Sequence, residues 1–473
     1  MPHDSAPNHS SHFDVVIIGA GMAGLAAGIR LAYFDKRVCI LERHYAYGGL
    51  NSYYRLGGRS YDVGLHALTN FVPPDKRAAP LNKALRQLRL TRDELDLCEQ
   101  KFSQVRFPGC SLKFTNDVSV LESEVARAFP DQSVGFARLL EVVRGYDDTR
   151  LDVAPASARR ELARWITDPM LREMLLCPLM YYGNAQPADM EFLQFVIMFK
   201  ALYLEGFSRP RAGVRGIIRA LVRKFRGCGG LLKMRCGVQS IEVDGGRAVG
   251  LRLDDGQTIS TETILSSAGY VETMRLCAEG NAGREVEREA GVISFVESIA
   301  VTDILPADLG HEAAIVFFND APAFTYDVPE GLVDLRSGVF CCPSNYDRHD
   351  DMAEGIVRVT WLADARRWAE LDEGAYVEAK ATCGRHFSER CDTMIPGISG
   401  HVLARDLFTP STIRRFTGHI NGAVYGAPRK RRDGRTGIEN LFLCGTDQGY
   451  LGIIGAMLSG ITMANMHVLA NEG

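Results

Sequence analysis

The sequence predicts an α/β protein in which one domain is assembled from separated segments and a second domain mixes helices with antiparallel strands. Three observations lead to this fold class. Residues 14–42 read as a strand, a glycine turn, a helix and a second strand. Residues 231–270 alternate short β-rich runs with glycine turns, and residues 440–470 again read as strand, turn and helix. The stretches between them have other periodicities and are assigned to the second domain.

Composition and charge exclude several classes of protein. The chain has 473 residues, of which 46% are hydrophobic and 24% charged, as expected for a globular protein of two or three domains. A net charge of −4 creates no field that attracts nucleic acid. The twelve cysteines form no CxxC pair, so we expect reduced thiols and no metal site. The polar first ten residues and the absence of an eighteen-residue apolar run predict a cytoplasmic protein without a spanning helix.

The first strand–turn–helix unit carries the pattern of a dinucleotide site. The apolar run Val15–Ile18 predicts a strand buried on both faces, and Gly19, Gly21 and Gly24 follow it in GxGxxG spacing. These glycines allow a tight turn, close approach of the backbone to a pyrophosphate, and close packing of helix on strand. Glu42 ends the next apolar run, where its carboxylate can accept hydrogen bonds from ribose hydroxyls. The predicted contact residues are Gly19, Ala20, Gly21, Met22, Ala23, Gly24, Glu42 and Arg43.

NAD and FAD both fit this unit, and the following residues favour FAD. Gly48 and Gly49 follow Glu42, and the segment "SYDVGLHAL" then places Asp62, Gly64 and His66 in a DxG context. This arrangement resembles FAD oxidoreductases of the amine oxidase and phytoene desaturase type, in which a double glycine follows the ribose acid and a DxG segment passes the flavin. The resemblance implies FAD, with further contacts from Gly49, Leu50, Gly64, Leu65 and His66.

Two later segments extend the resemblance over nearly the whole chain. Residues 231–270 read as a small antiparallel meander, in which Val238 resembles the family valine that meets adenine and Ala268 ends the last strand. Near the C-terminus, a strand to Cys444 is followed by a turn and by a helix expected to open near Gly455. In the family this helix points its N-terminus at the flavin, where its dipole stabilises negative charge. The implied contacts here are Gly445, Thr446, Asp447, Gly455, Ala456 and Met457.

The predicted Rossmann-like FAD-binding domain therefore comprises residues 12–85, 208–290 and 401–473, and the mixed α+β substrate domain comprises residues 86–207 and 291–400. Helical periodicity dominates residues 86–207. The apolar run Phe192–Phe199 fits either a core or the wall of a lipid site, with a core preferred. Residues 313–320 and 355–364 read as strands of an antiparallel sheet that forms the floor of a substrate cavity.

The C-terminal segment narrows the resemblance to one branch. Thr409-Pro410, Arg415-Phe416 and the residues from Gly422 to Gly426 resemble carotenoid isomerases and retinol saturases as well as phytoene desaturases. Leu65 and His66 stand where bacterial phytoene desaturases usually have proline, which argues against simple phytoene desaturation. The branch implies desaturation, saturation or isomerisation of C–C bonds in a long isoprenoid or carotenoid-like lipid. The alternatives are an amine oxidase-like enzyme acting on a small amine and a non-catalytic, flavin-containing lipid carrier.

Two residues are candidates for catalysis, and one helix for contact with a membrane. His66 can exchange a proton near the flavin, and Tyr425 can line the same cavity; a buried histidine bonded to backbone and an aromatic packing residue are the structural alternatives. Arg215, Arg219 and Arg223 share a helix face that follows the apolar run. This face suits either anionic lipid at the inner side of a membrane or plain solvent. The sequence carries no second GxGxxG unit for a nicotinamide domain and leaves the electron acceptor and the oligomeric state open.

Overall fold

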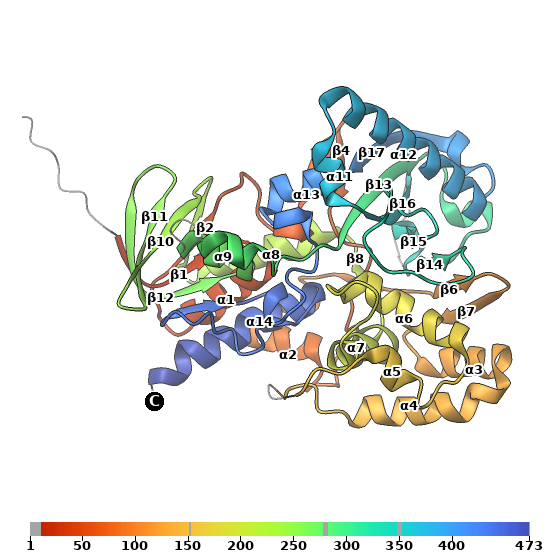
Figure 1. Cartoon of the computed structure of the whole chain (residues 1–473), viewed down its shortest axis with the longest axis horizontal. Coiled ribbons are helices and arrows are strands. Elements are labelled where there is room, and N and C mark those ends of the chain that lie inside the picture. The colour runs from red at the N-terminus through yellow and green to blue at the C-terminus, as the bar shows by residue number, and fades with distance from the viewer. Residues whose placement is uncertain (1–10, 151–152, 278–281, 348–351, 473) are drawn as a thin grey trace, which may run out of the picture.

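The computed structural model describes residues 11–150, 153–277, 282–347 and 352–472. Two seven-stranded sheets organise these residues. The first sheet and its helices lie on the left of Figure 1, and the second sheet, with two groups of helices, lies on the right. The mixed parallel and antiparallel architecture confirms the predicted α/β fold class.

The first sheet has the order β10-β11-β12-β1-β2-β9, with β18 paired to β12. Its core strands β12, β1, β2 and β9 run parallel, whereas β10, β11 and β12 form the antiparallel meander expected from the glycine turns. The strands span Ser11–Ile18 (β1), Val38–Glu42 (β2), Leu231–Met234 (β9), Val238–Asp244 (β10), Arg247–Leu253 (β11), Thr258–Ser266 (β12) and Leu441–Leu443 (β18). Three segments far apart in the chain thus build one sheet.

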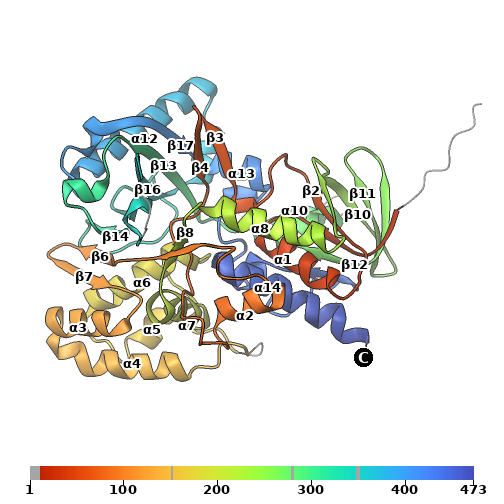
Figure 2. The same ribbon diagram turned by 180° about the vertical axis from the view of Figure 1, so that it is seen from behind.

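Strand β1 is buried on both faces because its side chains alternate between two cores. Val15 and Ile17 pack against helices, and Val16 and Ile18 pack against the meander. The helices on the first face are Met22–Ala32 (α1), Pro80–Leu88 (α2), Val214–Gly227 (α8) and Gly452–His467 (α14). Figure 2 shows α1 lying between α8 and α14, in agreement with the contacts of α1 with both helices.

The second sheet has the order β17-β13-β16-β15-β14-β6-β7 and is antiparallel except where β6 pairs with β14. Its strands span Ser103–Phe107 (β6), Cys110–Phe114 (β7), Ser294–Thr302 (β13), Ile315–Asn319 (β14), Ser337–Cys341 (β15), Gly355–Ala363 (β16) and Val402–Phe408 (β17). Strands β14 and β16 match the two strands predicted for this region. Strand β17 belongs to this sheet although it lies beyond the predicted domain boundary at residue 401.

Helices flank the second sheet in two groups, which Figure 1 shows above and below it. One group consists of Ala365–Glu370 (α11) and Glu373–Met394 (α12). The other consists of Val118–Ala128 (α3), Ser133–Gly145 (α4), Ala158–Leu162 (α5), Pro169–Gly183 (α6) and Phe192–Phe199 (α7). The remaining strands and α-helices are short: Tyr53–Leu56 (β3), Arg59–Asp62 (β4), Leu97–Glu99 (β5), Ser208–Pro210 (β8), Tyr270–Cys277 (α9), Ala282–Glu287 (α10) and Pro410–Thr417 (α13).

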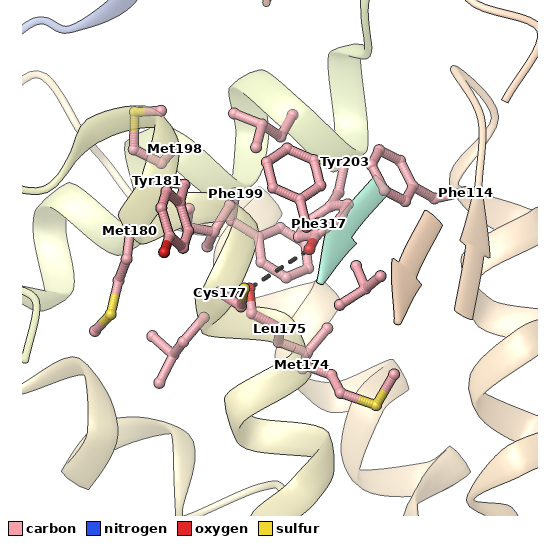
Figure 3. Packing of buried hydrophobic residues seen from close by; sticks show 14 of the residues in the cluster. Phe114, Met174, Leu175, Cys177, Met180, Tyr181, Met198, Phe199, Tyr203 and Phe317 are labelled. Carbon is pink, nitrogen blue, oxygen red and sulfur yellow. Dashed lines mark hydrogen bonds between the residues drawn. The ribbon is translucent and has the colours of Figure 1, made fainter. Parts of the chain in front are cut away.

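The apolar run Phe192–Phe199 is part of a core. Apart from Ile197, its residues are buried. The members of the largest cluster of packed apolar side chains among the described residues are Phe192, Phe195, Val196, Met198 and Phe199. Figure 3 shows Met198 and Phe199 of this run among Tyr203, Phe114 and residues of α6. The preferred interpretation as a core is therefore correct, because seven of the eight residues of the run are buried.

Candidate functional site

One cavity of about 940 Å³ joins the two halves of the molecule. Its walls come from the glycine turn after β1, the end of β2, the meander, the start of α14, and strands β13, β15, β16 and β17 of the second sheet. Residues of all three separated segments of the first sheet meet here. The second sheet supplies one wall, as the predicted floor of a substrate cavity requires.

The glycine turn presents backbone to this cavity. Gly19 has a φ of +96°, in the region that favours glycine, and a side chain at Gly24 would lie 2.1 Å from the carbonyl oxygen of Gly19. The Cβ position of Gly21 has no atom within 4 Å, so a side chain there would project into open space. Gly21 also caps α1, whose first turn holds no acidic residue. This helix N-terminus is therefore shaped for an anionic group such as a pyrophosphate.

Glu42 is oriented by backbone amides at the other side of the turn. The amide of Ala20 donates to Oε2 at 2.9 Å, and the amide of His44 donates to Oε1 at 2.9 Å. The residue is 8% exposed and lines the cavity. A carboxylate has more than two acceptor positions, so Glu42 can still accept hydrogen bonds from a ligand's hydroxyl groups.

Another part of the cavity wall consists of three glycines, Gly49, Gly64 and Gly445, with Leu50 and Thr446. Helix α14 begins there at Gly452 and contributes Gly452, Ile453 and Ala456 to the wall. The prediction that this helix opens near Gly455 was wrong by three residues, because α14 already begins at Gly452.

His66 lies at the junction of the two halves, where the cavity meets the second sheet. Its Nε2 is 3.0 Å from Thr360 Oγ1 and 3.3 Å from Glu297 Oε2. Its side chain is 12% exposed and borders the cavity. Burial lowers the pKa of His66, against the opposing effect of Glu297, so the ring is neutral at pH 7. His66 is thus bonded to side chains rather than, as the structural alternative supposed, to backbone.

The wall beyond His66 is aromatic. Tyr181, Tyr182, Phe295 and Tyr425 line it, and the Tyr425 hydroxyl donates to the carbonyl oxygen of Tyr181. Burial raises the pKa of Tyr425 well above its usual value, so this phenol is a neutral donor engaged with backbone. Tyr425 therefore lines the cavity wall, and its hydroxyl proton is already engaged in a hydrogen bond to the carbonyl oxygen of Tyr181.

Comparisons with known proteins agree with this arrangement. Residues 17–85 match the family described as NAD(P)-binding Rossmann-like domain. The chain is 23% identical to the chloroplastic prolycopene isomerase of Arabidopsis thaliana, over 96% of this chain and 82% of that one. It is 24% identical to a lycopene-forming phytoene desaturase of a Paracoccus species, over 87% of this chain and 86% of that one. A solved structure of putrescine oxidase with bound putrescine superposes with a TM-score of 0.63 at 16% identity, over 96% of this chain and 98% of that one.

The protein is an FAD-dependent oxidoreductase that resembles phytoene desaturases and prolycopene isomerases. The comparisons confirm the predicted resemblance, the predicted enzyme class and the predicted cofactor. The structure fits FAD, because the open cradle at Gly21 and the oriented carboxylate of Glu42 lie on the same cavity as the N-terminus of α14. When bound, FAD supplies an acceptor or donor of a hydride.

Most of the residues predicted to contact FAD line the cavity. Besides those named above, they are Met22, Ala23, Arg43, Val238 and Ala268. Six predicted contacts lie behind the wall instead: Ala20, Gly24, Leu65, Asp447, Gly455 and Met457. Ala20 orients Glu42, Gly24 permits helix packing, and Met457 is fully buried in the core beneath α14.

Asp447 lies behind the cavity wall and binds backbone amides, which the sequence did not indicate. Its carboxylate accepts the backbone N–H groups of Tyr270 at 2.6 Å and Ala427 at 2.7 Å, and Lys430 Nζ lies 3.8 Å away. The residue is 2% exposed. Its carboxylate therefore joins the loops around the cavity rather than facing a ligand.

Sequence reasoning missed the polar groups behind His66, namely Glu297, Arg358 and Thr360. Glu297 lies in "SFVESIAVT", in which every residue is buried. A carboxylate in an apolar strand must be paired, because burial of an isolated charge is very costly. This isolated acid was the available signal, although its partners could not be identified from it.

The basic face of α8 is exposed at two of its three arginines, and the apolar run expected beside it lies elsewhere. Arg219 and Arg223 are exposed, Arg215 is half-buried, and the Arg219 guanidinium lies 5.8 Å from the centre of the Tyr53 ring. The apolar run that precedes this helix in sequence is buried in the core. Within the described ranges, no helix combines the length and hydropathy needed to cross a bilayer.

Proposed function

We propose that the protein catalyses desaturation, saturation or isomerisation of C–C bonds in a long isoprenoid or carotenoid-like lipid. The observation that carries this proposal is the continuity of the cavity, which joins the dinucleotide-shaped end at Gly21 and Glu42 to an aromatic chamber at Tyr182 and Phe295. The names of the prolycopene isomerase and phytoene desaturase relatives support the same substrate class.

In the direction of desaturation, one substrate carbon loses a hydride and its neighbour loses a proton, so that a C=C bond forms. The aromatic walls orient an apolar chain and exclude water. His66 is an ionisable side chain on the cavity wall beside the aromatic chamber, and it is neutral at pH 7. It takes up the proton in desaturation and returns one in saturation.

Stopped-flow measurement of flavin reduction tests this function. Isoprenoid hydrocarbons are expected to bleach the flavin under anaerobic conditions, and small amines are not. His66→Phe should keep FAD and slow reduction by about two to four orders of magnitude, the usual contribution of general acid–base catalysis. His386→Phe is the matched control, because His386 lies exposed on α12 outside the cavity.

The outcomes separate the alternatives. Rapid reduction by small amines and none by any lipid would make the protein amine oxidase-like. A tightly bound lipid that never changes the flavin spectrum would make it a carrier. Equal rates for wild type and His66→Phe would remove His66 from the chemistry while leaving the substrate class intact.

We also propose that the protein is cytoplasmic and approaches the inner face of a membrane through Arg215, Arg219 and Arg223. The exposure of Arg219 and Arg223 supports this contact. A lipid-dissolved substrate requires an approach to the bilayer, and each arginine near an anionic surface contributes about 1 kcal/mol.

A further inference from the structure

The side chains behind His66 form a buried group that the pairing of two strands brings together. In the antiparallel register of β13 and β16, Glu297 stands opposite Thr360. Residues directly opposite in such a pair point to the same face of the sheet. Both side chains therefore reach the same ring nitrogen of His66, at 3.3 Å and 3.0 Å.

Glu297 is ionised in this group. Arg358 Nε donates to Glu297 Oε1 at 2.5 Å, and the two side chains are 2% and 4% exposed. Burial alone would raise the pKa of Glu297, but the charge of Arg358 and the contact with His66 lower it to about 2. An ionised carboxylate has no proton to donate, so Oε2 can only accept hydrogen bonds.

The hydroxyl of Thr360 donates to Glu297 and accepts from the ring of His66. Its Oγ1 lies 3.2 Å from Glu297 Oε2 and carries one proton, which the charged carboxylate attracts more strongly than a neutral ring does. The lone pairs of Oγ1 are then left for Nε2. Both groups next to Nε2 therefore accept, and Nε2 must carry the proton.

The other ring nitrogen is left open. Among the described residues, Nδ1 has no hydrogen-bond partner, and the ring borders the cavity. The neighbouring backbone is fixed, since the carbonyl oxygen of Leu65 accepts from Arg209 at 2.6 Å and from Arg358 at 2.5 Å. The carbonyl oxygen of His66 accepts from the Tyr346 hydroxyl at 3.1 Å. The His66 ring is consequently held in one orientation, and Nδ1 is its one hydrogen-bond acceptor.

We infer that Glu297 and Thr360 are positioning residues that hold His66 with its proton on Nε2 and present Nδ1 as the basic nitrogen to the cavity. The catalytic consequence rests on the proposed function, whereas the position of the proton does not. Other titratable or charged groups that act on His66 are Arg358 from β16 and Arg209 from β8; both cations disfavour a second proton on the ring.

Nitrogen-15 NMR of the FAD-loaded protein with labelled histidine tests the inference without any substrate. His66→Phe identifies the His66 signals. The expected wild-type spectrum near pH 7 shows a proton on Nε2 and none on Nδ1. In Glu297→Gln the side-chain amide can donate to Nε2, so part or all of the signal should move to the Nδ1-protonated form. A wild-type ring protonated on Nδ1, or on both nitrogens, would overturn the inference.

Two further variants test the inference even if Glu297→Gln does not fold. Glu297→Gln leaves the buried charge of Arg358 unpaired, which is strongly destabilising. The double variant Glu297→Gln/Arg358→Gln removes both charges, and Thr360→Val removes the hydroxyl with little change in shape. The double variant should lower the fraction of the Nε2-protonated form strongly, and Thr360→Val should lower it less, because the Glu297 carboxylate still accepts from Nε2. An unchanged spectrum in both would show that these residues do not hold the ring.

A double-mutant cycle then measures the catalytic consequence. Glu297→Gln/Arg358→Gln should slow flavin reduction by about 100-fold or more with little change in KM, because a wrongly protonated histidine cannot take up the proton. In the His66→Phe background the same pair of substitutions should cost less than about threefold. Equal losses in both backgrounds would indicate a merely structural role and overturn the inference.

Glu354→Gln is the matched control, because Glu354 pairs with Arg59 at the surface. It should change neither the tautomer nor the rate. If no isoprenoid reduces the flavin, the proposed function fails, and the NMR result alone still decides the position of the proton.

Discussion

Replacement of Glu42 is the sharpest test of the cofactor site. In Glu42→Ala, a ligand loses a charged acceptor for its ribose hydroxyls, and hydrogen bonds to charged groups contribute about 1.5–3 kcal/mol each. One such bond corresponds to a loss of FAD affinity of about 10- to 150-fold. The amides of Ala20 and His44 also lose their acceptor, and an unsatisfied buried group costs about 1–3 kcal/mol of stability.

Two measurements separate these effects. Titration of apoprotein with FAD, followed by quenching of flavin fluorescence, gives the affinity, and urea unfolding of the apoprotein gives the stability. Glu439→Gln is the control, because its carboxylate is 70% exposed and pairs with Arg247 outside the cavity. Unchanged affinity in a folded Glu42→Ala variant would refute the assignment of Glu42 to the ribose.

Three further predictions concern the turn, a buried acid and the basic helix. Gly21→Val should lower FAD affinity at least tenfold while apoprotein stability stays within about 0.5 kcal/mol, since its Cβ meets only open space; calorimetric titration with FAD checks this, and wild-type binding would contradict it. Burial raises the pKa of Glu205 from 4.5 to about 7, so the folded state binds more protons between these values and the free energy of unfolding falls as pH rises through them. Glu205→Gln should remove about 2.5 kcal/mol of this decrease between pH 5 and pH 8 in urea unfolding, and an unaltered pH dependence would show that the acid titrates normally. Replacement of Arg215, Arg219 and Arg223 by Gln should weaken sedimentation with anionic vesicles by roughly 1 kcal/mol per charge that faces the membrane, and equal sedimentation at low salt would assign this helix face to solvent.

The sequence by itself determined the parts of the cofactor site that are local in the chain. Gly19, Gly21 and Glu42 belong to one strand–turn–helix–strand unit, so their spacing along the chain already fixes their relative positions. The alternation of Val15–Ile18 between two cores was likewise predictable, since a continuous apolar strand must be covered on both faces.

Local pattern was less informative where a helix is apolar on all sides. Phe192–Phe199 would look the same in a core or against a lipid, and only its packing against α5 and α6 shows that it is core. Similarly, the residues from Gly452 to Met457 are all small or apolar, so the sequence did not reveal which of them begins α14 and which lies behind the wall.

The surroundings of His66 were decided by tertiary structure alone. Glu297 and Thr360 are 63 residues apart and meet because β13 and β16 pair in one register, and that pair reaches His66 only where the second sheet closes the cavity. A shift of one residue in the register would turn Thr360 to the opposite face. The sequence therefore specified a dinucleotide site from its local spacing, whereas the protonation of the adjoining histidine depends on contacts that only the folded sheet creates.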